Sequence, residues 1–332
     1  LRLRALDAAG RHAELAEAAG AFLDRRDAGE NRDEIEIMRL TAMVASAGLS
    51  NPSVITAVDE FLRKHPEHPR AAELQLAAAR HRLAVGDRTA ARRGLEAAEA
   101  AAQDDDVRAR IRGTLGDLNL EALYRGDPEV VKLVEYKVKS GDSIWEIATD
   151  HDVTQELLMR VNGIDDPRRL RVGQQLRVPM TDFSLVCDVA ANTLTLYNAG
   201  RFVKEYPVRT GRVAGTTPEG EFRILNKKTG PTWRPGNGYV YKPGDPNNEL
   251  GTRWMAFEGD ILGIHGTIHP ETVGSYASNG CIGLRTEEVE ELFDLVIVGT
   301  PLSIRGQQDP TRHDVIPARE VPPPVGTEMA AN

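Results

Sequence analysis

Two residues of this sequence, His265 and Cys281, have side chains that together support nucleophilic catalysis. A cysteine attacks as its thiolate, and a nearby imidazole takes the thiol proton or stabilises the negative charge. Consecutive amides at Asn279, Gly280 and Cys281 are placed to face a developing oxyanion. His265 precedes Cys281 by sixteen residues, so the fold has to bring them together. On spacing alone, a small buried hydrophobic cysteine remains the alternative.

The other cysteine and histidine patterns point away from disulfides and metals. With two cysteines in the chain, neither a disulfide framework nor a four-cysteine zinc site can form, so the alternatives are one single bridge or at least one working thiol. Cys187 lies in an apolar stretch and is expected in the core. His265 and His269 have the four-residue spacing of a metalloprotease helix, but Gly266 and Pro270 oppose a helix there. We therefore expect no metal and no organic cofactor.

The segment that must position these residues, 182–306, has the pattern of a mostly β domain. Short apolar or alternating stretches are separated by Gly and Pro turns, which favours a closed or sandwiched β structure. One helix is predicted from Thr286 to about Leu295, with Glu287 and Glu288 in its first turn. The expected strands are 184–189, 193–197, 202–209, 220–224 and 301–304.

Several local sequences in this segment resemble the YkuD-type L,D-transpeptidase catalytic domain, in the family's order. They are Asp188 with Asn192–Leu196, Thr217–Phe222, Asn248–Trp254, His265–Thr267, Ser278–Ile282 and Gly299–Pro301. The resemblance implies a β-sandwich and an enzyme that attacks the bond between the third and fourth residues of a peptidoglycan tetrapeptide stem. Such an enzyme releases D-Ala and holds the stem as a thioester. It then passes the stem to an amine, which forms a 3-3 cross-link or attaches a protein.

The resemblance also assigns roles to individual residues. It implies that Cys281 is the nucleophile, that His265 is its base, and that the Gly266 backbone orients the histidine. The nucleophile loop would contain Ser278, Asn279 and Gly280.

Two positions depart from the family pattern. Asn279 stands where a histidine is frequent, and Gly283 stands where arginine is usual. The missing arginine leaves open how the loop is braced or the stem carboxylate is held. Our hypothesis is that Arg285 substitutes for it.

Further substrate contacts are expected from basic and aromatic side chains. The basic candidates, each by itself more typical of a solvated surface, are Arg209, Arg212, Lys227, Lys228 and Arg253. Trp233 and Trp254 either wall the cleft or pack beneath it. Arg253, Trp254 and Arg285 are the substrate-binding residues that we predict.

Residues 134–180 form a separate unit that resembles a LysM module. The strings Tyr136–Ala148, Asn162–Ile164 and Leu170–Pro179 carry the resemblance, which implies a βααβ fold that binds N-acetylglucosamine-containing glycans. The implied groove residues are Gly141, Asp142, Ser143, Ile144, Asn162, Gly163 and Ile164. The alternative for some of them is structural, with Ile144 in the core and Asp142 capping a helix.

Residues 1–130 are predicted to form an all-α region. Apolar residues recur at helical spacing, as in Leu74, Ala78 and Leu83, and Asn51 precedes Pro52 as a cap. The segment 71–102 resembles a tetratricopeptide-type (TPR-like) hairpin, with a generic helical bundle as the alternative. Its expected role is a spacer or a platform for an envelope protein partner.

Charge and composition limit the remaining functions. The formal net charge of -9 argues against nucleic-acid binding, and no apolar run is long enough for a membrane span. The substrate predicts an envelope or periplasmic location, and a start at Leu1 is compatible with removal of a signal or anchor. Residues 307–332 are expected to be disordered. Two alternatives stay open: a non-catalytic peptidoglycan-binding protein with a degenerate domain, and a carboxypeptidase that uses water as acceptor.

Overall fold

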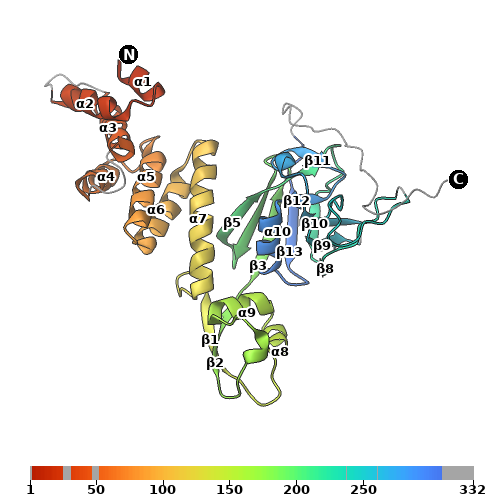
Figure 1. Ribbon diagram of the computed structural model, residues 1–332. Helices are drawn as coiled ribbons and strands as arrows, with labels where there is room; N and C mark the ends of the chain where they lie inside the picture. Colours follow the sequence, from red (N-terminus) through yellow and green to blue (C-terminus); the bar gives the residue numbers. More distant parts are fainter. Residues whose placement is uncertain (1, 25–30, 47–51, 237, 260, 309–332) are drawn as a thin grey trace. The chain divides into compact units, whose positions relative to one another are not determined.

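The computed structural model describes residues 2–24, 31–46, 52–236, 238–259 and 261–308 (Figure 1). The chain divides into two compact units, Leu1–Asn119 and Leu120–Asn332. The predicted cap at Asn51 and most of the predicted disordered tail lie outside the described residues.

The first unit is all-α, as predicted. In helices α5 and α6 the apolar residues at helical spacing lie on the buried face, where Leu74, Ala78 and Leu95 are fully buried. Asp87 caps α6 by accepting a hydrogen bond from the Ala90 amide at 3.0 Å. The helices are α1 (Arg2–Ala8), α2 (His12–Leu23), α3 (Arg32–Ser46), α4 (Pro52–Lys64), α5 (Ala71–Ala84), α6 (Arg88–Ala101) and α7 (Asp105–Arg125), whose last turns belong to the second unit. The TPR-like arrangement stays a prediction.

The segment after α7 has the predicted βααβ order. Strand β1 (Lys132–Lys137) pairs antiparallel with β2 (Gln175–Met180), and α8 (Ile144–Asp150) and α9 (Gln155–Asn162) lie between them in sequence. Ser143 and Glu146 form a capping box that begins α8. Ile144 is 1% exposed and packs in the core of this segment, so its structural role is confirmed.

The C-terminal domain is mostly β, and its two larger sheets share one core, as a β-sandwich requires. The five-stranded sheet has the order β5 (Arg201–Pro207), β4 (Thr193–Asn198), β3 (Phe183–Asp188), β13 (Pro301–Arg305), β7 (Gly220–Arg223). The four-stranded sheet has the order β12 (Ile282–Leu284), β10 (Leu262–Gly266), β9 (Arg253–Glu258), β8 (Asn226–Thr229). Helix α10 (Thr286–Phe293) packs on β9 and β10, and β6 (Thr210–Gly211) pairs with β11 (Tyr276–Ser278).

The βααβ segment and the β domain pack against each other within the second unit. Leu157 and Val161 of α9 belong to the same buried cluster as the core of the β domain. The Thr154 hydroxyl donates to the Asp294 carbonyl, and Arg160 pairs with the Asp294 carboxylate at 3.6 Å. Only two residues separate β2 from β3.

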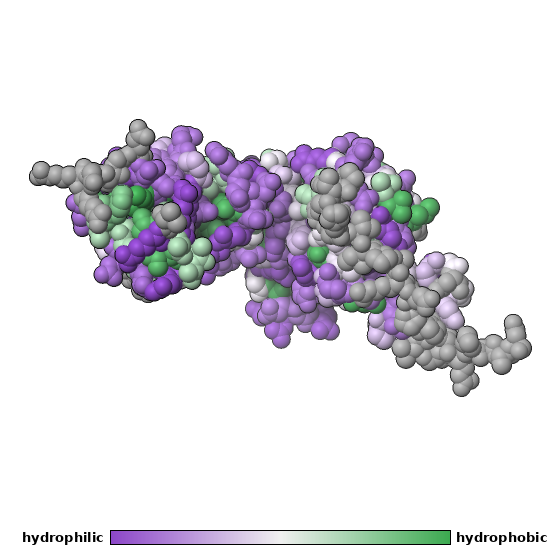
Figure 2. Space-filling view, turned by 90° about the horizontal axis from the view of Figure 1, so that it is seen from above, coloured by the Kyte–Doolittle hydropathy of each residue, from purple (hydrophilic) through white to green (hydrophobic). Residues whose placement is uncertain are grey.

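The face of the molecule in Figure 2 is mostly hydrophilic, with small apolar patches. Among the described residues, no helix combines the length and apolar character that a membrane span needs.

Candidate active site

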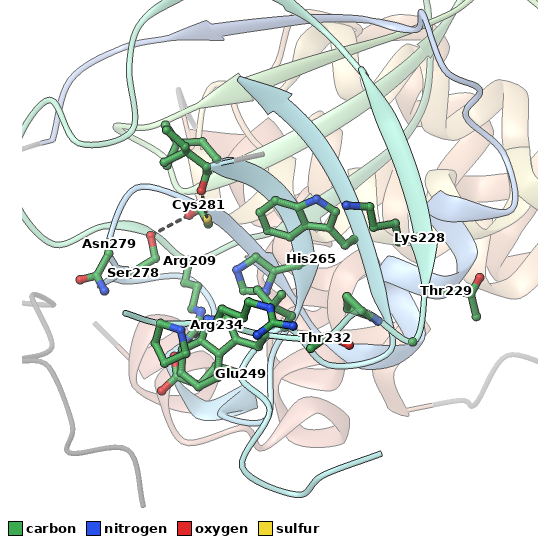
Figure 3. A pocket seen from close by; sticks show the side chains of 18 of the residues that line it. Arg209, Lys228, Thr229, Thr232, Arg234, Glu249, His265, Ser278, Asn279 and Cys281 are labelled. Atoms are coloured by element: carbon green, nitrogen blue, oxygen red, sulfur yellow. Dashed lines mark hydrogen bonds and ion pairs between the residues drawn. The ribbon is translucent and has the colours of Figure 1, made fainter. Parts of the chain in front are cut away.

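Parallel pairing of two short strands brings the two predicted catalytic residues together. Strands β10 and β12 pair with Ile264 opposite Ile282 and His265 opposite Gly283. Cys281 stands immediately before β12, so the fifteen residues between it and His265 form the crossover that returns the chain to the same sheet. Both side chains line one pocket with a volume of about 920 Å³ (Figure 3).

The turn that carries Cys281 is braced by two hydroxyl groups. Ser278 Oγ accepts from the Gly280 amide at 3.1 Å and donates to the Cys281 carbonyl at 2.6 Å. Thr217 Oγ1 donates to the Gly280 carbonyl at 2.9 Å. Gly280 has a φ of 122°, and a Cβ there would collide with the Thr216 carbonyl, so only glycine fits.

His265 is held as a neutral imidazole. It is 3% exposed, and its Nδ1 lies 2.5 Å from the Gly266 carbonyl oxygen. Because a carbonyl only accepts, we assign the hydrogen to Nδ1, which leaves Nε2 as the basic nitrogen. Burial, followed by the positive charge of Arg209, lowers the pKa of His265 to about 3. Trp254 stacks on the imidazole with ring centroids 5.8 Å apart.

The two thiols of the chain have opposite environments. Cys187 is fully buried on β3, where burial raises its pKa to about 12, and its predicted core location is confirmed. Cys281 is partly exposed in the pocket, and its Sγ lies 3.9 Å from the Ile261 carbonyl oxygen. Burial raises the pKa of Cys281, while the Gly263 amide and Arg209 oppose that rise. Of the two, Cys281 is therefore the thiol with access to a substrate.

The structure brings together some of the predicted substrate residues and not others. Trp254, Ser278 and Asn279 line the pocket with Cys281 and His265, and so does Trp233. Arg253 and Arg285 lie outside the pocket lining. Arg285 pairs with Glu288 at 3.1 Å, and Arg253 pairs with Glu290 at 3.4 Å.

Some residues of the site were not predicted in their present roles. Arg209 was one of the basic candidates for the substrate, with a solvated surface charge as the alternative, but it is 4% exposed and lines the pocket, because it pairs with Gly283 inside the fold. Thr217 and Glu249 lie in stretches that carried the family resemblance, and that resemblance was the only sequence signal for them. Their contacts to the turn that carries Cys281 and to Arg209 depend on long-range packing.

The residues predicted to line a glycan groove lie in different surroundings in the structure. Gly163 and Ile164 line a second, smaller pocket in the βααβ segment. Asp142 accepts from the Tyr136 hydroxyl at 2.9 Å and the Lys139 amide at 2.7 Å, so it braces the turn. The alternative that Asp142 caps a helix is wrong, because the cap of α8 is Ser143. Gly141 is exposed with a φ of 95°.

The predicted residue Asn162 also has structural contacts. Its side-chain amide donates to the Leu158 and Arg177 carbonyls, both at 2.8 Å, and accepts from the Arg177 amide. It therefore ties the end of α9 to β2.

Comparison with known proteins supports these observations. Residues 182–304 match the family model of the YkuD L,D-transpeptidase catalytic domain, and residues 136–179 match that of the LysM domain. The putative L,D-transpeptidase YkuD of Bacillus licheniformis is 30% identical over 178 residues, which cover 52% of this chain and 99% of the relative. The putative L,D-transpeptidase YqjB of Bacillus subtilis is 43% identical over 104 residues, which cover 30% of this chain and 57% of that protein.

An L,D-transpeptidase structure from Mycobacterium smegmatis is 20% identical and covers 40% of this chain and 63% of that chain, with a TM-score of 0.33. The match to nearly the whole length of the Bacillus licheniformis relative, together with the two matched domains, shows that this chain belongs to the YkuD family of L,D-transpeptidases and carries a LysM domain.

Proposed function

We propose that this protein is a cysteine-dependent L,D-transpeptidase that acts on the tetrapeptide stems of peptidoglycan. The observation that carries the proposal is the pocket in which the accessible Cys281 thiol and the neutral His265 imidazole lie together. The LysM and L,D-transpeptidase domains imply that the protein binds peptidoglycan, and both are typical of the cell envelope.

The proposed first half-reaction forms a thioester. His265 Nε2 takes the thiol proton as Cys281 Sγ attacks the carbonyl carbon before D-Ala. The tetrahedral oxyanion then collapses, the C–N bond breaks, and the imidazolium gives its proton to the departing amine of D-Ala. The Gly280 amide is bonded to Ser278 Oγ, so we assign oxyanion binding to the Cys281 amide.

The second half-reaction transfers the stem. An acceptor amine attacks the thioester, Nε2 removes a proton from the new amide nitrogen, and the leaving Cys281 thiolate regains it. The low pKa of His265 keeps the imidazole neutral before each attack. An acceptor amine gives a 3-3 cross-link or a protein attachment, whereas water gives a carboxypeptidase.

The pocket walls fit an anionic peptide. Arg212, Lys228 and Arg234 line it, with Glu249 as the acidic counterpart. Carboxylates of a stem peptide would be attracted by this excess of positive charge. The LysM domain would hold the glycan strand, and an envelope partner for the helical unit stays a prediction.

Intact-protein mass after incubation with a disaccharide-tetrapeptide tests the proposal, with Cys281→Ala as the matched control. We expect an adduct of the stem without D-Ala on the wild type and none on Cys281→Ala. If folded, reduced wild type gives neither adduct nor free D-Ala, the non-catalytic wall-binding alternative holds. Release of D-Ala with no amine-linked product identifies the carboxypeptidase.

A further inference from the structure

We propose that Arg209 is a positioning residue that holds a fixed positive charge beside Cys281 and His265, and that Gly283 lacks a side chain because Arg209 fills its space. The inference rests on the proposed role of Cys281 as nucleophile. Arg209, which pairs with Gly283, then supplies the guanidinium that we had expected from Arg285.

The backbones of Arg209 and Gly283 are bonded directly to each other. The Arg209 amide donates to the Gly283 carbonyl at 2.8 Å, and the Gly283 amide donates to the Arg209 carbonyl at 2.9 Å. A Cβ on Gly283 would lie 2.6 Å from Arg209 Nε and 2.7 Å from its Cγ. Gly283 does not have a positive φ, so the requirement for glycine comes from space and not from backbone conformation.

Arg209 is buried without full compensation of its charge. It is 4% exposed, and among the described residues its Nε has no hydrogen-bond partner. Its ion pair with Glu249 is long, at 3.9 Å. A buried guanidinium with an unused donor is costly, so a structural role alone does not explain it. Its place in the lining of the catalytic pocket does.

The charge of Arg209 reaches both Cys281 and His265, and for Cys281 it favours the reactive thiolate form. A positive charge opposes protonation of the imidazole and favours the thiolate, and it lowers the pKa of both His265 and Cys281. The other charged groups that act on Arg209 are Glu249, Glu271 and Arg212. His269 stands beside the two carboxylates, 4.0 Å from Glu249 and 3.7 Å from Glu271.

Alkylation of Cys281 measures this charge without any substrate. Rates with neutral iodoacetamide and anionic iodoacetate, measured from pH 5 to 9 and mapped to the Cys281 peptide, report thiolate content and local charge respectively. The variants are Arg209→Met, which removes the charge at similar size, and Arg209→Lys, which keeps it. Arg223→Met is the matched control, since Arg223 is exposed and donates to the Gly299 carbonyl.

We expect Arg209→Met to lower the iodoacetate-to-iodoacetamide rate ratio by about tenfold and to move the iodoacetamide profile to higher pH. Arg209→Lys should retain most of the wild-type ratio, and Arg223→Met all of it. An unchanged ratio and profile in folded Arg209→Met would overturn the inference. A wild-type Cys281 that reacts no faster than Cys187 would instead overturn the proposed nucleophile.

The steric half of the inference is tested by a double-mutant cycle on thermal stability. Gly283→Ala should lower the melting temperature of the wild type, because its Cβ meets the Arg209 side chain. The same substitution in an Arg209→Ala background should have a clearly smaller effect. Equal effects in the two backgrounds would show that Arg209 does not set the requirement for glycine.

Discussion

His265 is kept neutral by burial and by Arg209, and the same effects link it to folding stability. Its pKa is about 3 in the folded protein and near 6.5 in the unfolded chain. Between pH 3 and pH 6.5, the unfolded chain binds a proton at this residue and the folded protein does not. The free energy of unfolding is therefore unaffected by this residue's protonation above about pH 6.5, and it decreases as the pH falls towards 3.

We predict that His265→Gln weakens the acid sensitivity of folding. From pH 6 to pH 4, the free energy of unfolding of the wild type should fall more steeply than that of the variant, by up to about 1.4 kcal/mol per pH unit. Guanidinium unfolding at several pH values measures both slopes. Parallel curves would mean that the imidazole is protonated in the folded protein.

At the scale of elements, Lys227 of β8 ties the edge of a sheet to the end of a helix. Its Nζ donates to the Phe293 carbonyl at 2.7 Å and the Val296 carbonyl at 2.6 Å, just where α10 ends. A lysine at this end also complements the helix dipole. Burial lowers the pKa of Lys227 to about 8, so it is charged at neutral pH.

Replacing Lys227 by Met should lower the free energy of unfolding by about 1–3 kcal/mol, since two carbonyls lose their donor. Lys228→Met, at the exposed neighbouring position, should change it by no more than about 0.5 kcal/mol. Urea unfolding of the two variants gives the comparison. A Lys227→Met protein as stable as the wild type would show that water replaces both bonds.

Helices and strands with a clear periodicity of apolar residues were predictable from the sequence. The site was predictable only in part. Strands β3, β4 and β7 and helix α10 follow their apolar patterns closely. Strands β10 and β12 were missed, because they are short and almost wholly buried, without alternation. Cys281 and His265 were found through local resemblance. Arg209 was named only as one of five basic candidates, and its burial could not be predicted because it depends on pairing with a residue 74 positions away.

At the scale of the whole molecule, two consecutive leucines of α9 face different cores. Leu157 belongs to the buried cluster of the catalytic domain, whereas Leu158 belongs to the cluster of the LysM domain. Both are 1% exposed or less. Consecutive helix residues point about 100° apart, so one helix serves two cores.

This arrangement makes Leu157→Ala and Leu158→Ala a matched pair. Each substitution should lower the free energy of unfolding of its own cluster by about 2–5 kcal/mol. We predict that Leu157→Ala speeds amide hydrogen exchange in both α9 and α10, and that Leu158→Ala speeds it in the LysM domain alone. Identical exchange maps would show that the two clusters behave as one.

The shared helix also bears on how such proteins are assembled from parts. Removal of residues 136–179 at the family boundaries would take Leu157 and Val161 with it and leave a hole in the catalytic core of this chain. Recombination that exchanges this glycan-binding module must therefore bring a donor helix with matching apolar residues. Otherwise the LysM domain and the catalytic domain have to be exchanged together.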